Sequence, residues 1–381
     1  MTDNQNFSQR VVFLHPRISH TSTPLPELLG RLNLYGIALN KASKNRIGKL
    51  ECWIGCDFEP FSRLDDSSYS HIKIKRLSKS ANLPIMFTFR SAADLFKYRT
   101  QDTFVVGGDL GSSLIVIRLL RLFFKRIKFQ ISVHGEISKP RTLSRYILYS
   151  IRKINLNWAI NESQSLRVVS NHLADKIIRE HGISHSKIVI SPIPISLPGI
   201  RANKFKGKKC IGVIGRLHAE RGVEEAMEIL AEVLRAQENT QVIFVGSGPE
   251  LNKVKHWVAI NSFSGNVTVM GHLNVDAMRE IWNQVDICLS CAPSEGYGMT
   301  IREALLSGVA VIARESDGTL EARSELSKQL VLFKHQSDGV RLLISALNRP
   351  NRNLKKLEKM RQTQHALNEA SLEVLARSWM S

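Results

Sequence analysis

The stretch from residue 285 to residue 308 constrains the fold of this chain most strongly. It begins with an apolar run at residues 285–289, continues through a turn rich in Ser, Pro and Gly, and enters a helix-forming run at Thr300. This order predicts a strand, a tight turn and a helix that begins at the end of the strand. Such strand-to-helix units are typical of an open α/β sheet.

The turn of this stretch has the composition of an anion-binding loop. Gly296 and Gly298 let the backbone approach a ligand closely, and the amides of residues 297–301 are donors at a helix start that favour a phosphate. Glu295 and Glu303 lie on either side of that start. Because carboxylates accept hydrogen bonds from hydroxyls, the pair predicts a site for two polyol groups flanking a diphosphate. That is the shape of a nucleotide sugar.

A second motif, GRLHAERG at residues 215–222, also lies between a strand and a helix. The strand is predicted at residues 210–214, and the helix begins near Val223. Arg216 and Arg221 flank the turn, where two guanidinium groups can bind a diphosphate with bidentate geometry.

Together these motifs make the chain resemble the family 4 glycosyltransferases, which are retaining enzymes of the GT-B fold. The resemblance covers most of residues 160–325 and, more weakly, the rest. It implies an α/β protein with two Rossmann-like domains whose mainly parallel sheets face each other across a cleft. The implied domains are an acceptor-side domain at residues 1–196, a linker at 197–209, a nucleotide-sugar domain at 210–360, and a final helix at 361–381 that packs back on the first domain.

The resemblance also implies roles for individual residues. Glu295 would hold sugar hydroxyls and Glu303 the ribose, while Arg216 and Arg221 would stabilise the leaving diphosphate. His134 follows the strand predicted at residues 129–133 and matches the family's histidine that reaches the donor sugar. The predicted catalytic residues are therefore His134, Arg216, Arg221 and Glu295. The predicted donor-binding residues are Gly215, Arg216, Arg221, Gly246, Gly271, Glu295, Gly296, Tyr297, Gly298, Met299, Thr300 and Glu303.

The reaction implied by this family requires no protein nucleophile, cofactor or metal. Retaining members are thought to react on the front face of the sugar, where the leaving phosphate oxygen helps to deprotonate the acceptor hydroxyl. The predicted catalytic region also has no evident Asp-x-Asp metal motif. We expect a UDP- or GDP-linked sugar as the donor substrate. A GT-B-fold epimerase or hydrolase that acts on nucleotide sugars is the alternative enzyme.

Length and composition set further bounds. At 381 residues, the chain exceeds the roughly 250 to 300 residues at which one hydrophobic core stops growing, so two domains are expected. Because neither a signal peptide nor a run of about 20 uncharged apolar residues is evident, we expect a cytoplasmic protein. The five cysteines include one CxxC spacing but no second pair, which favours reduced structural thiols over a metal site.

Positive charge is concentrated in the first half of the chain. The net charge is +19, and the first 200 residues hold 29 Lys and Arg against 14 Asp and Glu. A helix expected at residues 112–128 places basic side chains beside an apolar stripe, as in helices at membrane surfaces. We therefore expect a glycan or glycolipid acceptor and peripheral contact with the inner face of the cell membrane. The basic residues expected at that surface are Arg118, Arg121, Lys125 and Lys128.

A protein that binds nucleic acid is the alternative outside the enzymes, because a strong basic field also attracts polynucleotides. The basic stripe lacks interleaved surface aromatics on which bases stack, and the phosphate-site motifs lie in the less basic half of the chain. We therefore expect no nucleic-acid partner.

Overall fold

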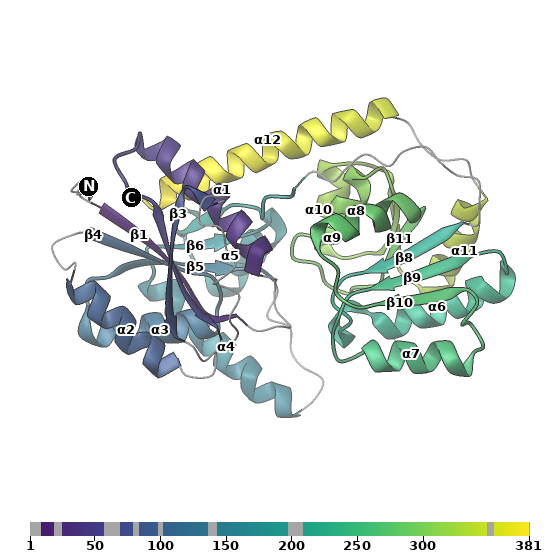
Figure 1. Cartoon of the computed structure of the whole chain (residues 1–381), viewed down its shortest axis with the longest axis horizontal. Helices are drawn as coiled ribbons and strands as arrows, with labels where there is room; N and C mark the ends of the chain where they lie inside the picture. Colours follow the sequence, from purple (N-terminus) through teal and green to yellow (C-terminus); the bar gives the residue numbers. More distant parts are fainter. Residues whose placement is uncertain are drawn as a thin grey trace. The chain divides into compact units, whose positions relative to one another are not determined.

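The computed structural model of the chain describes residues 9–18, 25–56, 69–78, 84–97, 102–135, 143–196, 209–348 and 354–380. The chain divides into two units. Unit 1 comprises Met1–Pro194 and Glu369–Ser381, and unit 2 comprises Ile195–Asn368. Each unit is an α/β domain with its own parallel sheet (Figure 1). Nearly all of the linker expected at residues 197–209 lies outside the described residues.

Unit 1 is built on a seven-stranded sheet with the order β3-β2-β1-β4-β5-β6-β7. Its neighbouring strands all pair in parallel. The strand order reverses between β1 and β4, and ligands of open α/β sheets bind beyond the carboxyl ends of strands at such a point. The strands are β1 (Gln9–Ile18), β2 (Leu50–Cys56), β3 (Ile72–Ser78), β4 (Asp102–Gly107), β5 (Lys128–Val133), β6 (Ser165–Val168) and β7 (Ile188–Ile190).

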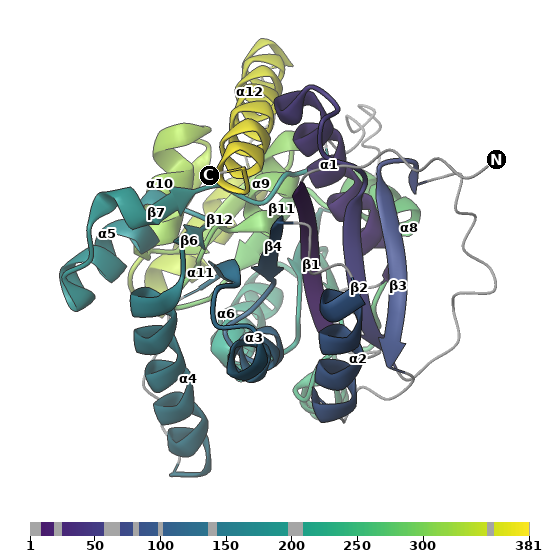
Figure 2. The same ribbon diagram turned by 90° about the vertical axis from the view of Figure 1, so that its left-hand side faces the viewer.

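Helices cover both faces of this sheet (Figure 2). Consecutive residues of a strand point to opposite faces, and Val11, Val12, Phe13 and Leu14 of β1 are all buried, so both faces must be covered. One core joins β1, β2 and β4 to α1 and to the chain end around Trp379. The helices are α1 (Leu25–Ser43), α2 (Pro84–Lys97), α3 (Ser112–Phe123), α4 (Leu143–Glu162), α5 (Asn171–His181) and the last part of α12 (Leu354–Ser378).

The helix expected at residues 112–128 is shorter than predicted. Helix α3 ends at Phe123, a turn follows, and Lys128 is already the first residue of β5. Lys128 pairs with Phe104 of β4, so the ladder between the two strands overrides the helical pattern of the sequence. The four basic residues of the predicted stripe therefore do not lie on one helix.

Unit 2 is built on a six-stranded parallel sheet with the order β10-β9-β8-β11-β12-β13. The order reverses between β8 and β11. The strands are β8 (Cys210–Ile214), β9 (Gln241–Val245), β10 (Val267–Met270), β11 (Ile287–Ser290), β12 (Ala310–Arg314) and β13 (Leu330–Phe333). The helices are α6 (Val223–Ala236), α7 (Leu251–Ile260), α8 (Val275–Gln284), α9 (Met299–Leu306), α10 (Asp317–Glu325), α11 (Gln336–Leu347) and the first part of α12.

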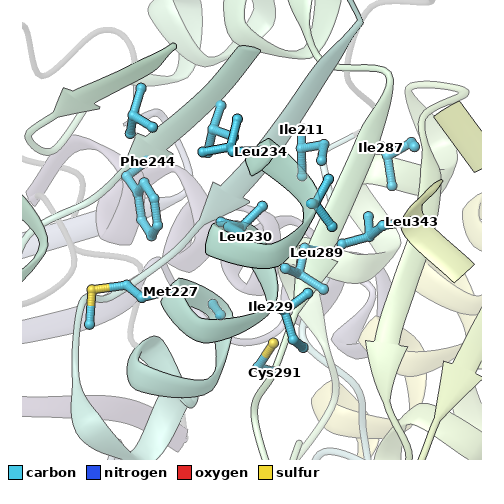
Figure 3. Packing of buried hydrophobic residues seen from close by; sticks show 14 of the residues in the cluster. Ile211, Met227, Ile229, Leu230, Leu234, Phe244, Ile287, Leu289, Cys291 and Leu343 are labelled. Atoms are coloured by element: carbon cyan, nitrogen blue, oxygen red, sulfur yellow. The ribbon is translucent and has the colours of Figure 1, made fainter. Parts of the chain in front are cut away.

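The main core of unit 2 lies between its sheet and helices α6 and α11 (Figure 3). Leu230 of α6, Ile211 of β8 and Leu289 of β11 are almost completely buried there. Burying a Leu or Ile side chain stabilises a protein by about 1.5–3 kcal/mol, so this layer fixes α6 against the two central strands. As a result, the loops that follow β8 and β11 have fixed starting points.

Candidate functional site

The candidate donor site lies beyond the carboxyl ends of β8 and β11, the two strands at which the order of the unit 2 sheet reverses. Arg216 and Arg221 are in the loop after β8, and Glu295 is in the loop after β11. The loops are in close contact at Gly222. A Cβ at this residue would lie 2.0 Å from the carbonyl oxygen of Cys291, and the backbone φ of 67° also favours glycine. Only glycine lets the two loops approach this closely.

An ion pair joins the two loops. Arg221 Nη1 donates to Glu295 Oε1 at 2.6 Å. The Glu295 side chain is only 7% exposed, whereas that of Arg221 is 36% exposed. Sequence reasoning assigned both residues to the site, and the structure brings them together. One guanidinium nitrogen is used by Glu295, so further N–H donors of Arg221 can reach a ligand.

Arg216 is held more loosely. Its Nη2 donates to Glu220 Oε1 at 2.8 Å, and both side chains are more than half exposed. Partial burial would raise the pKa of Glu220, but the positive charge of Arg216 and its hydrogen bond lower that pKa overall. An exposed pair of this kind contributes little to stability, so Arg216 can leave Glu220 for an anionic ligand at small cost.

Helix α9 begins beside these arginines. Its N-cap, Gly298, has the left-handed φ of 70°, and no side chain in the described part of the chain caps it. The Thr300 hydroxyl lies 3.9 Å from the position that a Cβ on Gly215 would take, so the helix start is adjacent to the loop after β8. The first amides of α9 are therefore available at the same loop cluster as the two arginines.

Glu303 lies one turn into α9, and Glu295 lies just before the helix. Both carboxylates act on the buried thiol of Cys288: burial, followed by the negative charges of Glu303 and Glu295, raises the pKa of that thiol to about 12. Both carboxylates thus lie close enough to the Cys288 thiol for their charges to act on it. The thiol itself stays protonated, as expected for a structural cysteine.

Two glycine turns complete this edge of the sheet. The Gly246 amide donates to the carbonyl oxygens of Met270 and Gly271, at 3.2 and 3.1 Å. The Leu217 amide donates to the Ser247 carbonyl at 2.9 Å. The loops after β8, β9 and β10 are therefore connected to one another, and the predicted residues Gly215, Gly246 and Gly271 share this edge.

Tyr297 differs from the other predicted donor-binding residues. Its side chain is 4% exposed, and its hydroxyl accepts a hydrogen bond from Gln364 Nε2 at 3.3 Å. The Arg302 guanidinium lies 3.9 Å from the centre of its ring. The Tyr297 side chain therefore points into the protein, and the residue can contact a ligand only through its backbone. Met299, by contrast, is partly exposed at the first position of α9.

His134 belongs to unit 1 and follows β5. Its Nε2 lies 3.0 Å from the Gly108 carbonyl oxygen, which can only accept, so Nε2 carries the proton. Desolvation of the ring by the surrounding protein and then the positive charge of Arg167 lower the pKa of His134 to about 4, although the side chain is exposed. At neutral pH the ring is therefore uncharged, and Nδ1 has a free lone pair for a ligand hydroxyl.

Asp109 follows β4 and binds the start of the next helix. Its carboxylate accepts hydrogen bonds from the Gly111 amide at 2.6 Å and from the Ser113 hydroxyl at 2.9 Å. Asp109 thus caps the start of α3.

The basic residues expected at a membrane surface have different surroundings. Arg118 Nη1 donates to Asn155 Oδ1 at 2.9 Å, and its guanidinium lies 5.2 Å from the centre of the Trp158 ring. Arg121 forms an ion pair with Glu162 at 2.8 Å. These two arginines join α3 to α4, and Arg118 is exposed as well, so lipid contact through them stays a prediction.

Lys125 is exposed in the turn after α3, and Lys128 is exposed at the start of β5. The same region exposes apolar side chains, since Leu122 is 70% and Phe123 is 65% exposed. Across the described residues, no helix is long and apolar enough to cross a bilayer. In the same part of the chain, no group of three or more His, Cys, Asp or Glu residues could hold a metal ion.

Two buried polar residues beside the site were not predicted from the sequence: Arg302 in α9 and Gln364 in α12. A basic residue within a helical pattern is usually exposed, and only the contacts in the folded chain reveal that both side chains are internal. One hint of this arrangement is present in the sequence, the Gly-x-Gly spacing around Tyr297. Two glycines in a turn predict that a ligand or another part of the protein approaches the backbone closely.

Comparison with known proteins identifies the class. Residues 200–365 match the family model of the glycosyl transferases group 1. The chain is 20% identical to an uncharacterized glycosyltransferase, YqgM, of Bacillus subtilis (strain 168), over 49% of this chain and 52% of that protein. It is 26% identical to the alpha-monoglucosyldiacylglycerol synthase of Streptococcus pneumoniae (strain ATCC BAA-255 / R6), over 28% of this chain and 24% of that protein. The chain thus spans about half or less of the length of these relatives.

Solved structures show a similar fold. The crystal structure of Anabaena Alr3699/HepE in complex with UDP-glucose superposes with a TM-score of 0.66 and 14% identity, over 96% of both chains. The two parallel-sheet α/β domains are those of the GT-B fold. The family match thus covers residues 200–365, which lie in unit 2, and the fold of both units is that of GT-B glycosyltransferases.

Proposed function

We propose that the protein is a retaining glycosyltransferase of the family 4 type, which moves a sugar from a nucleoside-diphosphate sugar to a hydroxyl of a membrane-associated glycan or glycolipid. The observation that supports this most strongly is the meeting of Arg221 and Glu295 beside the start of α9. Guanidinium groups, free backbone amides and carboxylates are gathered in one loop cluster, and these are the groups that a diphosphate and its attached polyols require.

The chemistry that these groups supply is electrostatic. When the glycosidic bond breaks, the diphosphate leaves with increasing negative charge, and preorganised donors aimed at that charge lower the barrier. Arg221 is already fixed by Glu295, whereas the exposed Arg216 is free to follow the ligand. Because two guanidinium groups and the α9 amides provide positive charge, we propose a metal-independent reaction with no protein nucleophile.

The carboxylates and His134 would orient the substrate. Glu303 would accept hydrogen bonds from the ribose, and Glu295, with one oxygen on Arg221, would accept from sugar hydroxyls through the other. His134 is uncharged at neutral pH, so its Nδ1 would accept a hydroxyl proton in a hydrogen bond rather than act as an acid.

The donor is proposed to carry UDP or GDP. Alr3699/HepE, a structure of similar fold, has been crystallised with UDP-glucose, which favours UDP. The pneumococcal relative is named for a glucosylated diacylglycerol, which favours a lipid-linked acceptor.

A ligand panel tests this proposal directly. Thermal unfolding is measured with UDP-, GDP- and ADP-sugars, since a ligand at 100 times its Kd stabilises a protein by about 2.7 kcal/mol. The stabilising donor is then incubated with and without a membrane-lipid fraction. Sugar attached to lipid supports the transferase. Without any acceptor, release of free sugar would instead identify a hydrolase, and an altered sugar on the nucleotide would identify an epimerase. If none of the three donor classes raises the unfolding temperature, the proposal is contradicted.

Nucleic acid is the competing ligand for the basic unit 1. Binding of unrelated oligonucleotides, measured over a range of salt concentrations, distinguishes this possibility, because a polynucleotide site loses affinity steeply as salt rises. Tight oligonucleotide binding at physiological salt together with no donor binding would favour a nucleic-acid protein.

We also propose that unit 1 contacts the cytoplasmic face of the cell membrane, through exposed side chains of α2 and of the end of α3. Phe89 and Phe96 of α2 are each 60% exposed, and Leu122 and Phe123 of α3 are exposed to a similar degree. Exposed basic residues of the same segments are Arg90, Lys97, Lys125 and Arg126. Apolar side chains combined with basic ones are typical of a surface that binds anionic lipid, where each basic residue contributes about 1 kcal/mol.

Vesicle sedimentation tests this surface. We expect the wild-type protein to sediment with vesicles that contain anionic phosphatidylglycerol at low salt, and the variant Phe89→Ser/Phe96→Ser/Leu122→Ser to remain in solution. The matched control is Ile260→Ser/Val275→Ser, which removes exposed apolar side chains of unit 2. A wild-type protein that stays in solution, or a triple variant that sediments as well as the control, would exclude this surface.

A further inference from the structure

A chain of polar side chains leads away from the loop that precedes α9; Tyr297, Arg302 and Gln364 are buried, and Asn368 is partly exposed. It begins at Tyr297, continues through Arg302 and Gln364, and reaches Asn368, whose side chain binds the backbone of Ile195. All of these residues belong to unit 2. Nothing in the proposed reaction requires this set of contacts.

Arg302 is the charged member of the chain. Its side chain is 1% exposed, and its Nε donates to the Tyr297 carbonyl oxygen at 2.9 Å. Its Nη2 donates to Glu325 Oε2 at 2.5 Å, and Nη1 donates to Gln364 Oε1 at 3.4 Å. A buried guanidinium is strongly destabilising unless its donors are satisfied, so these partners must be in place for the loop to adopt this conformation.

Gln364 connects the loop to α12. It is completely buried, and while its Oε1 accepts from Arg302, its Nε2 donates to the Tyr297 hydroxyl at 3.3 Å and to Asn368 Oδ1 at 3.0 Å. The orientation of the amide is therefore fixed from both ends. Because a buried polar network of this kind has one satisfied geometry, it specifies position more narrowly than apolar packing does.

Asn368 binds both polar groups of one residue. Its Nδ2 donates to the Ile195 carbonyl oxygen at 2.8 Å, and its Oδ1 accepts from the Ile195 amide at 3.1 Å. Ile195 is the first residue of unit 2 and Asn368 is the last. The two points at which the chain leaves unit 2 for unit 1 are thus bound to each other and, through Gln364, to the loop at Tyr297.

We propose that Arg302, Gln364 and Asn368 are positioning residues. They hold the loop that carries Glu295 and the start of α9 in its binding conformation, and they transmit a change in this loop to the backbone at Ile195. The transmission to Ile195 rests on the proposed function, because it takes a nucleotide as the ligand that changes the loop. The positioning of the loop concerns the contacts alone and can be tested without ligand.

Hydrogen exchange of the ligand-free protein tests the connection. The variants are Tyr297→Phe, which removes one hydroxyl, and Gln364→Leu, which removes the central amide. Loss of one buried hydrogen bond is worth about 0.5–1.5 kcal/mol, so we expect exchange of the Ile195 amide to accelerate about two- to tenfold in each variant. The matched control is Arg361→Leu, because Arg361 Nη1 also joins α12 to α9 but donates to the carbonyl of Leu306, the last residue of that helix, at 2.8 Å.

Nucleotide binding provides the second measurement, with UDP and GDP as probes. In the wild-type protein we expect the bound nucleotide to slow hydrogen exchange of the Ile195 amide. In Gln364→Leu we expect weaker nucleotide binding and no change in this exchange rate. In Arg361→Leu we expect the nucleotide to slow the exchange as it does in the wild type. If Tyr297→Phe and Gln364→Leu leave Ile195 exchange at the wild-type rate, or accelerate it only as Arg361→Leu does, the positioning role is refuted. A different outcome is that neither nucleotide binds the wild type, although Tyr297→Phe and Gln364→Leu accelerate Ile195 exchange without ligand. This outcome would refute the proposed function and the transmission of a ligand-induced change to Ile195, and it would still support the positioning role.

Discussion

Replacing Arg221 by Ala is expected to destabilise unit 2 more than replacing Glu295 by Ala, although both variants break the same ion pair. The reason is the difference in burial of the two partners. Glu295 is 7% exposed and would remain as a buried carboxylate without its cation, whereas Arg221 is 36% exposed and can turn to water when Glu295 is removed. Leaving a buried charged group without a partner costs more than losing an exposed one.

The magnitudes follow from this asymmetry. Breaking a fully buried pair costs about 3–5 kcal/mol, and the partial exposure of Arg221 reduces this, so we expect about 2 kcal/mol for Arg221→Ala. We expect about 1 kcal/mol for Glu295→Ala. Arg216→Ala is the control: its pair with Glu220 is more than half exposed on both sides, so the change should cost about 0.5 kcal/mol. The double variant Arg221→Ala/Glu295→Ala should cost less than the two single changes added together, because no buried carboxylate remains.

Thermal unfolding of the full chain without ligand measures these differences. For a unit of this size, 1 kcal/mol corresponds to about 2–4 °C in Tm, so Arg221→Ala should lower Tm by about 4–8 °C. Hydrogen exchange of the β8 and β11 amides assigns the transition to unit 2. A Tm of Arg221→Ala within 1–2 °C of the wild type, or a larger loss for Glu295→Ala than for Arg221→Ala, would refute the reasoning.

Three further predictions concern the proposed reaction. Glu303→Ala and Arg216→Ala should each lower kcat by about 10²- to 10³-fold with the fold retained, as steady-state kinetics and circular dichroism will show, and near-normal turnover would remove that residue from the site. Because arginines and helix amides supply the positive charge, EDTA should leave transfer unchanged; a loss that Mg²⁺ or Mn²⁺ restores would contradict this. NMR titration should give His134 a pKa well below 6.5, near 4. A neutral His134 therefore stabilises the fold above pH 6.5, and this contribution should decline as pH falls toward 4 and be absent in His134→Gln.

Sequence reasoning worked best where a strand is a short apolar run enclosed by helices. The strand expected at residues 210–214 is β8 with the same bounds, and the strand expected at residues 129–133 is β5, which begins one residue earlier at Lys128. In these segments, local pattern and burial favour the same structure.

The same reasoning failed where a buried charge interrupts the pattern. Strand β6 begins at Ser165 and contains Arg167. Arg167 is almost completely buried because its guanidinium donates to the Ser191 carbonyl at 3.0 Å and to the Tyr35 hydroxyl at 2.9 Å. These partners lie far away in the sequence, so the residues around Arg167 gave no sign that a strand contains it.

The candidate site was predictable in its composition but not in its pairing. Arg221 and Glu295 were both identified from motifs, yet their ion pair depends on how two loops approach each other at Gly222. The inward direction of Tyr297 depends on Gln364, which is 67 residues away. Contacts of this range are set by the sheet order and helix packing, which a local pattern does not encode.

The ion pair has a consequence for how the site would receive a ligand. A diphosphate must compete with Glu295 for Arg221, but Glu295 occupies one of the five donors of the guanidinium and holds its orientation. The ligand therefore meets a cation that is already placed, and little side-chain entropy is lost when Arg221 binds it. Arg216 is the opposite case, because its weak exposed pair must be exchanged and its side chain ordered on binding. The two arginines thus have different roles. Arg221 holds its positive charge at a fixed position, whereas the Arg216 side chain can move toward the diphosphate as its negative charge increases.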